Sequence, residues 1–171
     1  MAEAIPLVVH STHEAGIKLG GIGAVLDGLL RSNEYVHNVQ RTILTGPMLA
    51  GDPTHMERLL SPRNGVTIRY SSLHGYFHGV SSEVRDALQA VEQTYAIGLL
   101  YGTRVFGSEE HEILLVDVTN PNWDEVNLFK YYIWQHTGLD AARYSYDPEF
   151  NLYFIIAQPI FAALKAIGAD E

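Results

Sequence analysis

A glycine-rich segment with a single lysine follows an apolar run near the start of the sequence. The segment contains Lys18, Gly20, Gly21 and Gly23, and the apolar run covers residues 5–9. Glycines let the backbone approach a ligand closely, and a helix N-terminus offers unpaired N–H groups and a positive dipole end to an anion. The lysine adds a mobile positive charge suited to phosphate. These residues predict a phosphate-contacting loop at the edge of a parallel sheet.

Other nucleotide-binding motifs fit less well. Residues 21–26 begin like the dinucleotide fingerprint G-x-G-x-x-G, but Leu26 stands where the last glycine belongs. The second expected strand, near residues 41–45, lacks the acidic residue that would hold a ribose, and the sequence has no Gly-Lys-Ser/Thr of a P-loop. One alternative stays open, in which the glycines at this helix start serve packing alone.

The same segment resembles the Lys-x-Gly-Gly-Leu/Ile loop of glycogen and starch synthases. Residues 18–22 read Lys-Leu-Gly-Gly-Ile, and Glu14 precedes the lysine by four positions. The Glu-x-x-x-Lys-x-Gly-Gly-Ile spacing is closer to the eukaryotic-type glycogen synthases than to the bacterial type, whose intervening segment is longer. Outside this segment, the chain resembles the family more loosely, in its order of strands and helices.

This resemblance implies a retaining glucosyltransferase with the two-domain GT-B fold. Such an enzyme elongates an α-1,4-glucan from ADP-glucose or UDP-glucose, so a nucleotide-sugar donor and a glucan acceptor are the expected partners. No further cofactor and no metal is expected. Lys18, Gly20 and Gly21 are the expected contacts of the donor phosphates. No catalytic residue is expected in this chain, because the histidine motif and the glutamate of the family belong to later segments.

Three further residues are candidate ligand contacts. His13 and Glu14 lie beside the glycine-rich loop. Asp117 ends an apolar segment, and doubly wound folds bind ligands at the carboxyl ends of their strands. The alternatives are local hydrogen bonding for His13 and capping of the next turn for Asp117.

Two other groups of residues have both a functional and a structural interpretation. His74 and His78 have the spacing of zinc ligands on a helix, but the glycines between and after them argue against a helix. Aromatic residues in the last third of the chain could stack on sugar, although at helical spacing they are more typical of a core. These aromatic residues are Tyr131, Tyr132, Trp134, Tyr144 and Tyr146.

Composition excludes several classes of protein. The chain has 171 residues with 11 Lys and Arg against 20 Asp and Glu, a net charge of −9, and no basic cluster, which disfavours nucleic-acid binding. The absence of cysteine excludes disulfides and thiolate metal sites. The N-terminus lacks a basic region, and the following apolar run is too short for a signal peptide or a membrane span. A cytoplasmic protein is expected.

Alternation of strand and helix patterns predicts an α/β fold. We expect a single domain over residues 1–171 with a Rossmann-like, doubly wound, mainly parallel sheet and helices on both faces. Residues 5–11 are expected as its central strand, with the loop 18–23 at its C-terminal edge. The other expected strands are 41–45, 66–71, 102–106 and 112–118, and the expected helices are 23–31, 53–60, 81–95, 124–135 and 149–167.

The resemblance also implies that a synthase continues beyond this chain. In the family, a strand follows the last helix and a C-terminal nucleotide-binding domain comes after it. We therefore expect that this chain is truncated before the end of the N-terminal domain and inactive alone. The alternative is a non-catalytic nucleotide- or glucan-binding module with the same fold, and a reading frame that continues past Glu171 would favour the enzyme.

Overall fold

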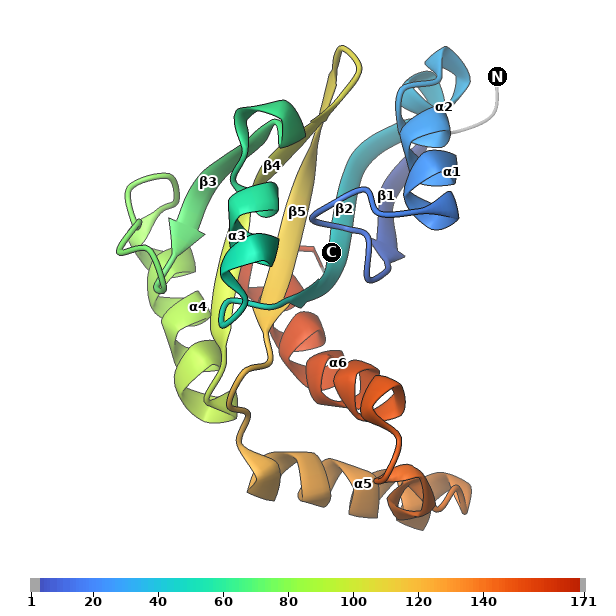
Figure 1. Cartoon of the computed structure of the whole chain (residues 1–171), viewed down its shortest axis with the longest axis vertical. Helices are drawn as coiled ribbons and strands as arrows, with labels where there is room; N and C mark the ends of the chain where they lie inside the picture. The colour runs from blue at the N-terminus through green and yellow to red at the C-terminus, as the bar shows by residue number, and fades with distance from the viewer. Residues whose placement is uncertain (1–3, 170–171) are drawn as a thin grey trace.

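The computed structural model describes residues 4–169, which form a five-stranded sheet with helices on both faces (Figure 1). The strands are β1 (Ile5–Ser11), β2 (Val39–Met48), β3 (Val66–Ser71), β4 (Gly98–Phe106) and β5 (Glu109–Asp117). The helices are α1 (Gly21–Leu30), α2 (Asn33–Asn38), α3 (Pro53–Leu59), α4 (Ser82–Tyr95), α5 (Trp123–Thr137) and α6 (Pro148–Ala166), with 3-10 turns η1 (Pro62–Asn64) and η2 (Ala141–Tyr144). The predicted α/β class is confirmed.

The sheet has the strand order β1-β2-β5-β4-β3. The pairs β1–β2 and β2–β5 are parallel, whereas β4 pairs antiparallel with both β5 and β3. Four strands therefore share one direction and β4 alone opposes them. The tight turn between β4 and β5 requires this reversal, and Gly107 supplies its left-handed residue with φ +67°.

The prediction that residues 5–11 form the central strand is wrong. The strand β1 lies at an edge of the sheet and pairs with β2 alone, and its residues Ile5 and Val9 are exposed. The hairpin β4–β5 joins the other side of β2, which makes β5 the central strand. Apolar runs occur in edge strands that are covered on one face as well as in central strands. The composition of residues 5–9 therefore did not distinguish the two positions.

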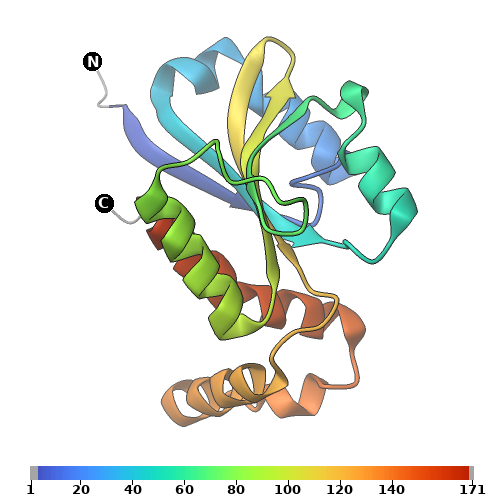
Figure 2. The same cartoon turned by 90° about the vertical axis from the view of Figure 1, so that its left-hand side faces the viewer.

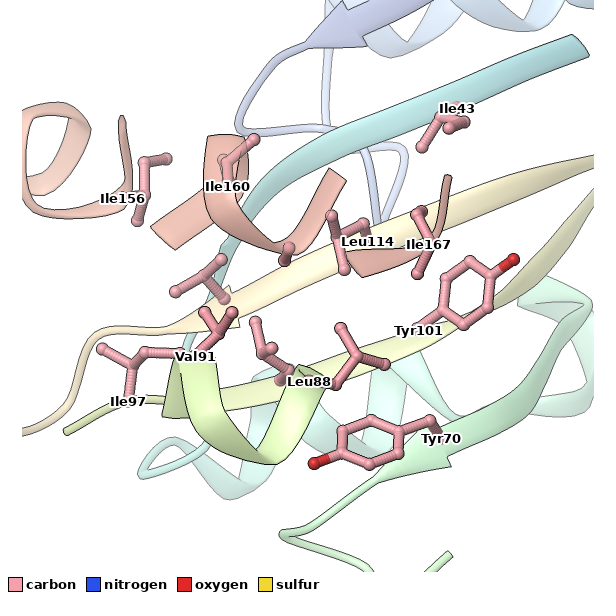
Figure 3. Packing of buried hydrophobic residues seen from close by; sticks show 13 residues of the cluster. Ile43, Tyr70, Leu88, Val91, Ile97, Tyr101, Leu114, Ile156, Ile160 and Ile167 are labelled. Carbon is pink, nitrogen blue, oxygen red and sulfur yellow. The ribbon is translucent and has the colours of Figure 1, made fainter. Parts of the chain in front are cut away.

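Two apolar layers hold the helices on the sheet, and Figure 2 shows one pair of helices on each side. The pair α4 and α6 covers one face and the pair α1 and α3 covers the other. The first layer includes Ile43, Tyr70, Leu88, Val91, Leu114, Ile156 and Ile160 (Figure 3). The second layer includes Leu26, Leu30, Leu44, Leu59, Ile113 and Leu115, together with Ala15 and Ile17 from the segment between β1 and α1. That segment is therefore part of the core.

The helix α5, the turn η2 and the start of α6 form an arm that extends beyond the sheet (Figures 1 and 2). Inside the arm, the Phe154 ring lies 4.9 Å from that of Phe129 and 5.4 Å from that of Phe150, centroid to centroid. The expectation that the aromatic residues of this region pack in a core is wrong for the five that the sequence singled out. Tyr131, Tyr132, Trp134, Tyr144 and Tyr146 are exposed. Among residues 4–169, no helix has the length and apolar composition that crossing a bilayer requires.

Candidate functional site

The β1–α1 loop (residues 12–20) is organised around the side chain of Glu14. Its Oε2 accepts hydrogen bonds from the backbone N–H groups of Leu19 and Gly20, each at 2.7 Å. Only 3% of Glu14 is exposed, whereas Leu19 and Gly20 are exposed, so these are partly buried, charge-assisted hydrogen bonds. The carboxylate thus closes the loop and covers the first amides before helix α1.

This packing restricts the glycines at the end of the loop and the start of α1 to different degrees. A Cβ atom on Gly23 would lie 2.3 Å from Oε2 of Glu14 and 3.1 Å from the Cα of Lys18. A Cβ atom on Gly20 would lie 3.4 Å from the other carboxylate oxygen. Gly21 differs from both, because a Cβ atom there would meet nothing within 4 Å. Packing therefore explains Gly23 and contributes at Gly20, but it does not explain Gly21.

The environment of Glu14 lowers the pKa of its carboxyl group. The N–H of Gly20 has the largest effect, burial opposes it, and the N–H groups of Leu19 and Gly23 lower the pKa further, as does the neighbouring His13. The side chain is consequently a carboxylate at neutral pH. It provides the negative charge that the positive end of the α1 dipole favours.

The amides of Gly21 and Ile22 remain available at the start of α1. Neither N–H group donates a hydrogen bond to any of the described residues, and both residues are exposed. The next amide, that of Gly23, faces the Glu14 carboxylate and lowers its pKa, and the amide of Ala24 bonds to the carbonyl of Gly20 at 3.1 Å. The loop therefore presents two adjacent unpaired donors to solvent at the N-terminus of a 10-residue helix.

Lys18 lies along the first turn of α1. Its Nζ is 3.1 Å from Oδ2 of Asp27, and 48% of its side chain is exposed. The lysine and Asp27 also line a cleft of about 930 Å³, to which Arg58, Arg63 and Arg104 contribute. Gly20 and Gly21 are not among the residues that line this cleft. The structure thus places Lys18 beside the loop but joins its ammonium group to a carboxylate.

Arg104 supports the loop through contacts that sequence analysis did not predict. Its Nη1 donates to the carbonyl oxygens of Ala15 at 3.0 Å and Glu14 at 3.3 Å. Burial lowers the pKa of the guanidinium, against the effect of the nearby Asp27 and Glu14 carboxylates. Asn64 supports the same loop, because its Nδ2 donates to the carbonyl of Gly16 at 2.8 Å. The sequence marks Arg104 only as a charged residue within the mainly apolar segment that forms β4.

His13 and Asp117, the other candidate contacts, have different surroundings. His13 Nε2 lies 3.7 Å from Oε1 of Glu14, and its Nδ1 is 3.2 Å from the hydroxyl of Tyr153 on α6. Asp117 is buried, and its Oδ1 accepts from the backbone N–H of Ala50 at 3.0 Å and from the hydroxyl of Thr119 at 2.6 Å. Asp117 therefore fastens two turns at the carboxyl ends of β2 and β5, as the capping alternative predicted.

The remaining histidines show no common site. His74 Nδ1 is 2.9 Å from the hydroxyl of Ser71, and His10 Nε2 is 2.9 Å from that of Tyr35. Within residues 4–169, no three histidine or acidic side chains are grouped closely enough to hold a metal ion.

None of the protein-family models, curated proteins and solved structures compared with this chain matches it. The functional argument therefore depends on the loop, on its sequence spacing and on the chemistry of the groups it exposes.

Proposed function

We propose that this chain is the acceptor-side domain of a retaining glucosyltransferase that elongates an α-1,4-glucan from ADP-glucose or UDP-glucose. The observation that carries the proposal is the pair of unpaired amides at Gly21 and Ile22, which start a helix directly after a loop braced by Glu14. The resemblance of residues 14–22 to the glycogen and starch synthase loop supplies the reaction class.

The donor phosphates would lie against the amides of Gly21 and Ile22. Fixed N–H dipoles at a helix N-terminus stabilise negative charge without reorganising, and charge builds up on the diphosphate as it leaves the sugar. Gly21 fits this role, because the space beside its Cα is open and lets a ligand approach the backbone. The amide of Gly20 has no such role in the structure, since Glu14 already accepts its hydrogen bond.

Lys18 would contribute the mobile charge. Its Nζ would leave Asp27 and turn to the phosphates, which requires that a dianionic ligand compete with one partly exposed carboxylate. Exposed ion pairs are weak, at about 0–1 kcal/mol, so this exchange is feasible.

Glu14 would hold the loop rather than touch the donor. Its carboxylate fixes Leu19, Gly20 and the first turn of α1, so that the two free amides keep one orientation. Preorganisation of this kind is the main source of electrostatic catalysis in enzymes.

Glucosyl transfer by the product of the complete reading frame that encodes this chain is the test. The assay uses ADP-glucose or UDP-glucose with maltoheptaose as primer, and chain extension is the expected result. Donor binding without extension would favour the alternative of a non-catalytic nucleotide- or glucan-binding module. A product that neither binds these donors nor extends the primer would refute the enzyme.

The 171-residue chain alone is expected to bind donor weakly and to transfer no sugar. A single loop does not exclude water or hold donor and acceptor in attack geometry. Rapid turnover by this chain would contradict its assignment as one side of a two-domain cleft.

A further inference from the structure

The helix α5 carries a stripe of exposed side chains along one side. Asn127, Tyr131 and Trp134 follow one another at spacings of four and three residues, which places them along one side of a helix. Tyr131 is 51% exposed and Trp134 is 53% exposed. Their ring centroids are 6.0 Å apart with an angle of 42° between the ring planes.

Packing of the arm does not explain this stripe. The arm is held together by the rings of Phe129, Phe150 and Phe154, with Phe154 packed against the other two. Tyr131 and Trp134 therefore leave about half of their large rings exposed. Exposed rings of this size in one cluster mark a binding surface.

A pocket of about 320 Å³ lies beside the two rings, a volume at the lower end of the range of roughly 300–1,000 Å³ for small-molecule sites. Its polar lining comes from Asn127, Asp140, Ser145 and Lys130. These four supply an amide, a carboxylate, a hydroxyl and an ammonium group. The pocket thus combines flat apolar faces with both donors and acceptors of hydrogen bonds.

Lys130 is a buried charged residue that organises the wall of this pocket. The residue is 6% exposed, and its Nζ donates to Ser145 Oγ at 3.0 Å and to Asn151 Oδ1 at 3.1 Å. No carboxylate among residues 4–169 lies within 4.0 Å of it. A buried lysine that bonds to neutral oxygens holds Ser145, which directly follows η2, against α5 and fixes the shape of the pocket.

We propose that this pocket and its two rings bind an oligosaccharide, with the ring faces stacked on pyranose rings and the polar groups bonded to sugar hydroxyls. The oligosaccharide is the α-1,4-glucan acceptor, an identity that rests on the proposed function. Pyranoses present apolar C–H faces and a dense rim of hydroxyls, which matches a pocket of two aromatic rings and four polar groups. A protein partner fits less well, because the centres of protein interfaces are depleted of charged residues.

The position of the arm agrees with an acceptor site. Tyr153, on the helix that leads from the arm to the sheet, contacts His13 in the β1–α1 loop. Figure 1 shows the arm beyond the carboxyl ends of β1, β2 and β5, the same end of the sheet from which that loop emerges. A glucan on α5 would therefore approach the molecule from the end where the donor loop begins.

Affinity electrophoresis and calorimetry of the 171-residue chain with maltoheptaose test this inference. We expect Tyr131→Ala and Trp134→Ala each to raise the Kd about tenfold, which corresponds to roughly 1.4 kcal/mol. Tyr132→Ala is the matched control, because Tyr132 is exposed on the same helix but does not line the pocket. Its Kd is expected to stay within about twofold of the wild-type value. Cellohexaose is included as a glucan of the other linkage and is expected to bind more weakly.

Three results would overturn the inference: no binding of maltoheptaose at millimolar concentration, equal weakening by all three variants, or a dimer in sedimentation that Trp134→Ala dissociates. The last result would make this face an interface between copies of the chain. Titration of the wild-type chain with ADP-glucose and UDP-glucose separates the two proposals. Donor binding without glucan binding would refute the pocket alone, whereas glucan binding without donor binding would refute the donor loop alone.

Discussion

The backbone nitrogen of Gly20 lies 2.7 Å from Oε2 of Glu14, so the protein's own carboxylate occupies the first anion-binding position of its glycine-rich loop. This relationship gives a physical reason for the spacing between Glu14 and the glycines. The loop must fold back over the carboxylate, and the helix then begins with its next two amides free. The anion site is thus preformed, with Glu14 bound to its first amides. A ligand phosphate would bind the two amides that remain free.

Removal of the Glu14 carboxylate is expected to loosen the loop and to destabilise the fold. Glu14→Gln keeps the shape but loses the charge, and we expect it to lower the free energy of unfolding by about 1–2 kcal/mol, with about 3 kcal/mol for Glu14→Ala. Urea denaturation at neutral pH measures both. Variants as stable as the wild type would mean that these hydrogen bonds do not hold the loop.

The lowered pKa of Glu14 predicts a pH dependence. A carboxyl group whose pKa is lower in the folded than in the unfolded state stabilises the fold fully above its ordinary value of 4.5. That contribution disappears as the pH falls through the lowered folded-state pKa. The stability difference between the wild type and Glu14→Gln should therefore be full at pH 7 and shrink below pH 4.5. A difference that grows on acidification would contradict the assigned sign.

Two glycines of α1 provide a matched pair of substitutions. Gly23→Ala would place a methyl group 2.3 Å from the Glu14 carboxylate, whereas Gly28→Ala meets nothing within 4 Å. We expect Gly23→Ala to destabilise by about 2 kcal/mol or more through overpacking, and Gly28→Ala to stabilise by up to about 1 kcal/mol through helix propensity. Thermal melts of both variants compare them directly. Equal effects would show that the Gly23 contact is not a constraint.

Lys18 and Asp27 are expected to have opposite effects on ligand binding. Lys18→Ala should weaken binding of ADP-glucose or UDP-glucose about ten- to hundredfold, because a charge-assisted contact to phosphate is lost. Asp27→Asn removes the carboxylate that competes for Lys18 and should strengthen binding. Both variants should be within about 1 kcal/mol of wild-type stability, because this ion pair is exposed. Calorimetric titration with each donor measures both effects. Weaker donor binding by both variants would show that Lys18 does not leave Asp27 to bind the phosphates.

The strand order predicts which amides are protected from hydrogen exchange. The strand β5 has a partner on each side, whereas β1 pairs with β2 alone. In native-state exchange, the amides of Ile113–Val116 should exchange far more slowly than those of Leu7–Val9. Protection of β1 equal to that of β5 would favour the central position that the sequence had indicated.

Local patterns predicted the elements well, and long-range pairing poorly. The helix 81–95 and the strand 66–71 were found within one residue, because a serine cap and a period-two alternation are local signals. The strand β1 is at the edge because β5 pairs with the other side of β2. The residues of β1 do not determine where β5 pairs. The strands expected at 102–106 and 112–118 are parts of β4 and β5, which pair over a longer stretch than the local pattern showed and turn at Gly107.

The candidate site was predicted in part. Glycines and a lysine before a helix indicated an anion site, and the structure shows free amides at Gly21 and Ile22. The capture of the Gly20 amide by Glu14 and the support from Arg104 depend on side chains brought together by the fold, which spacing alone does not reveal. The exposure of Tyr131 and Trp134 was missed for a similar reason, because Phe129, Phe150 and Phe154 fill the interior that they were expected to occupy.

The central claim is that the amides of Gly21 and Ile22 receive the donor phosphates, and backbone amide NMR tests it most directly. The ¹⁵N-labelled 171-residue chain is titrated with ADP-glucose and with UDP-glucose into the millimolar range expected for so few contacts. We predict saturable shifts that are largest at Gly21 and Ile22, with the Gly28 amide of the same helix unchanged. Resonances of Gly21 and Ile22 that stay fixed at saturating donor concentration, or shifts confined to other parts of the chain, would contradict the account.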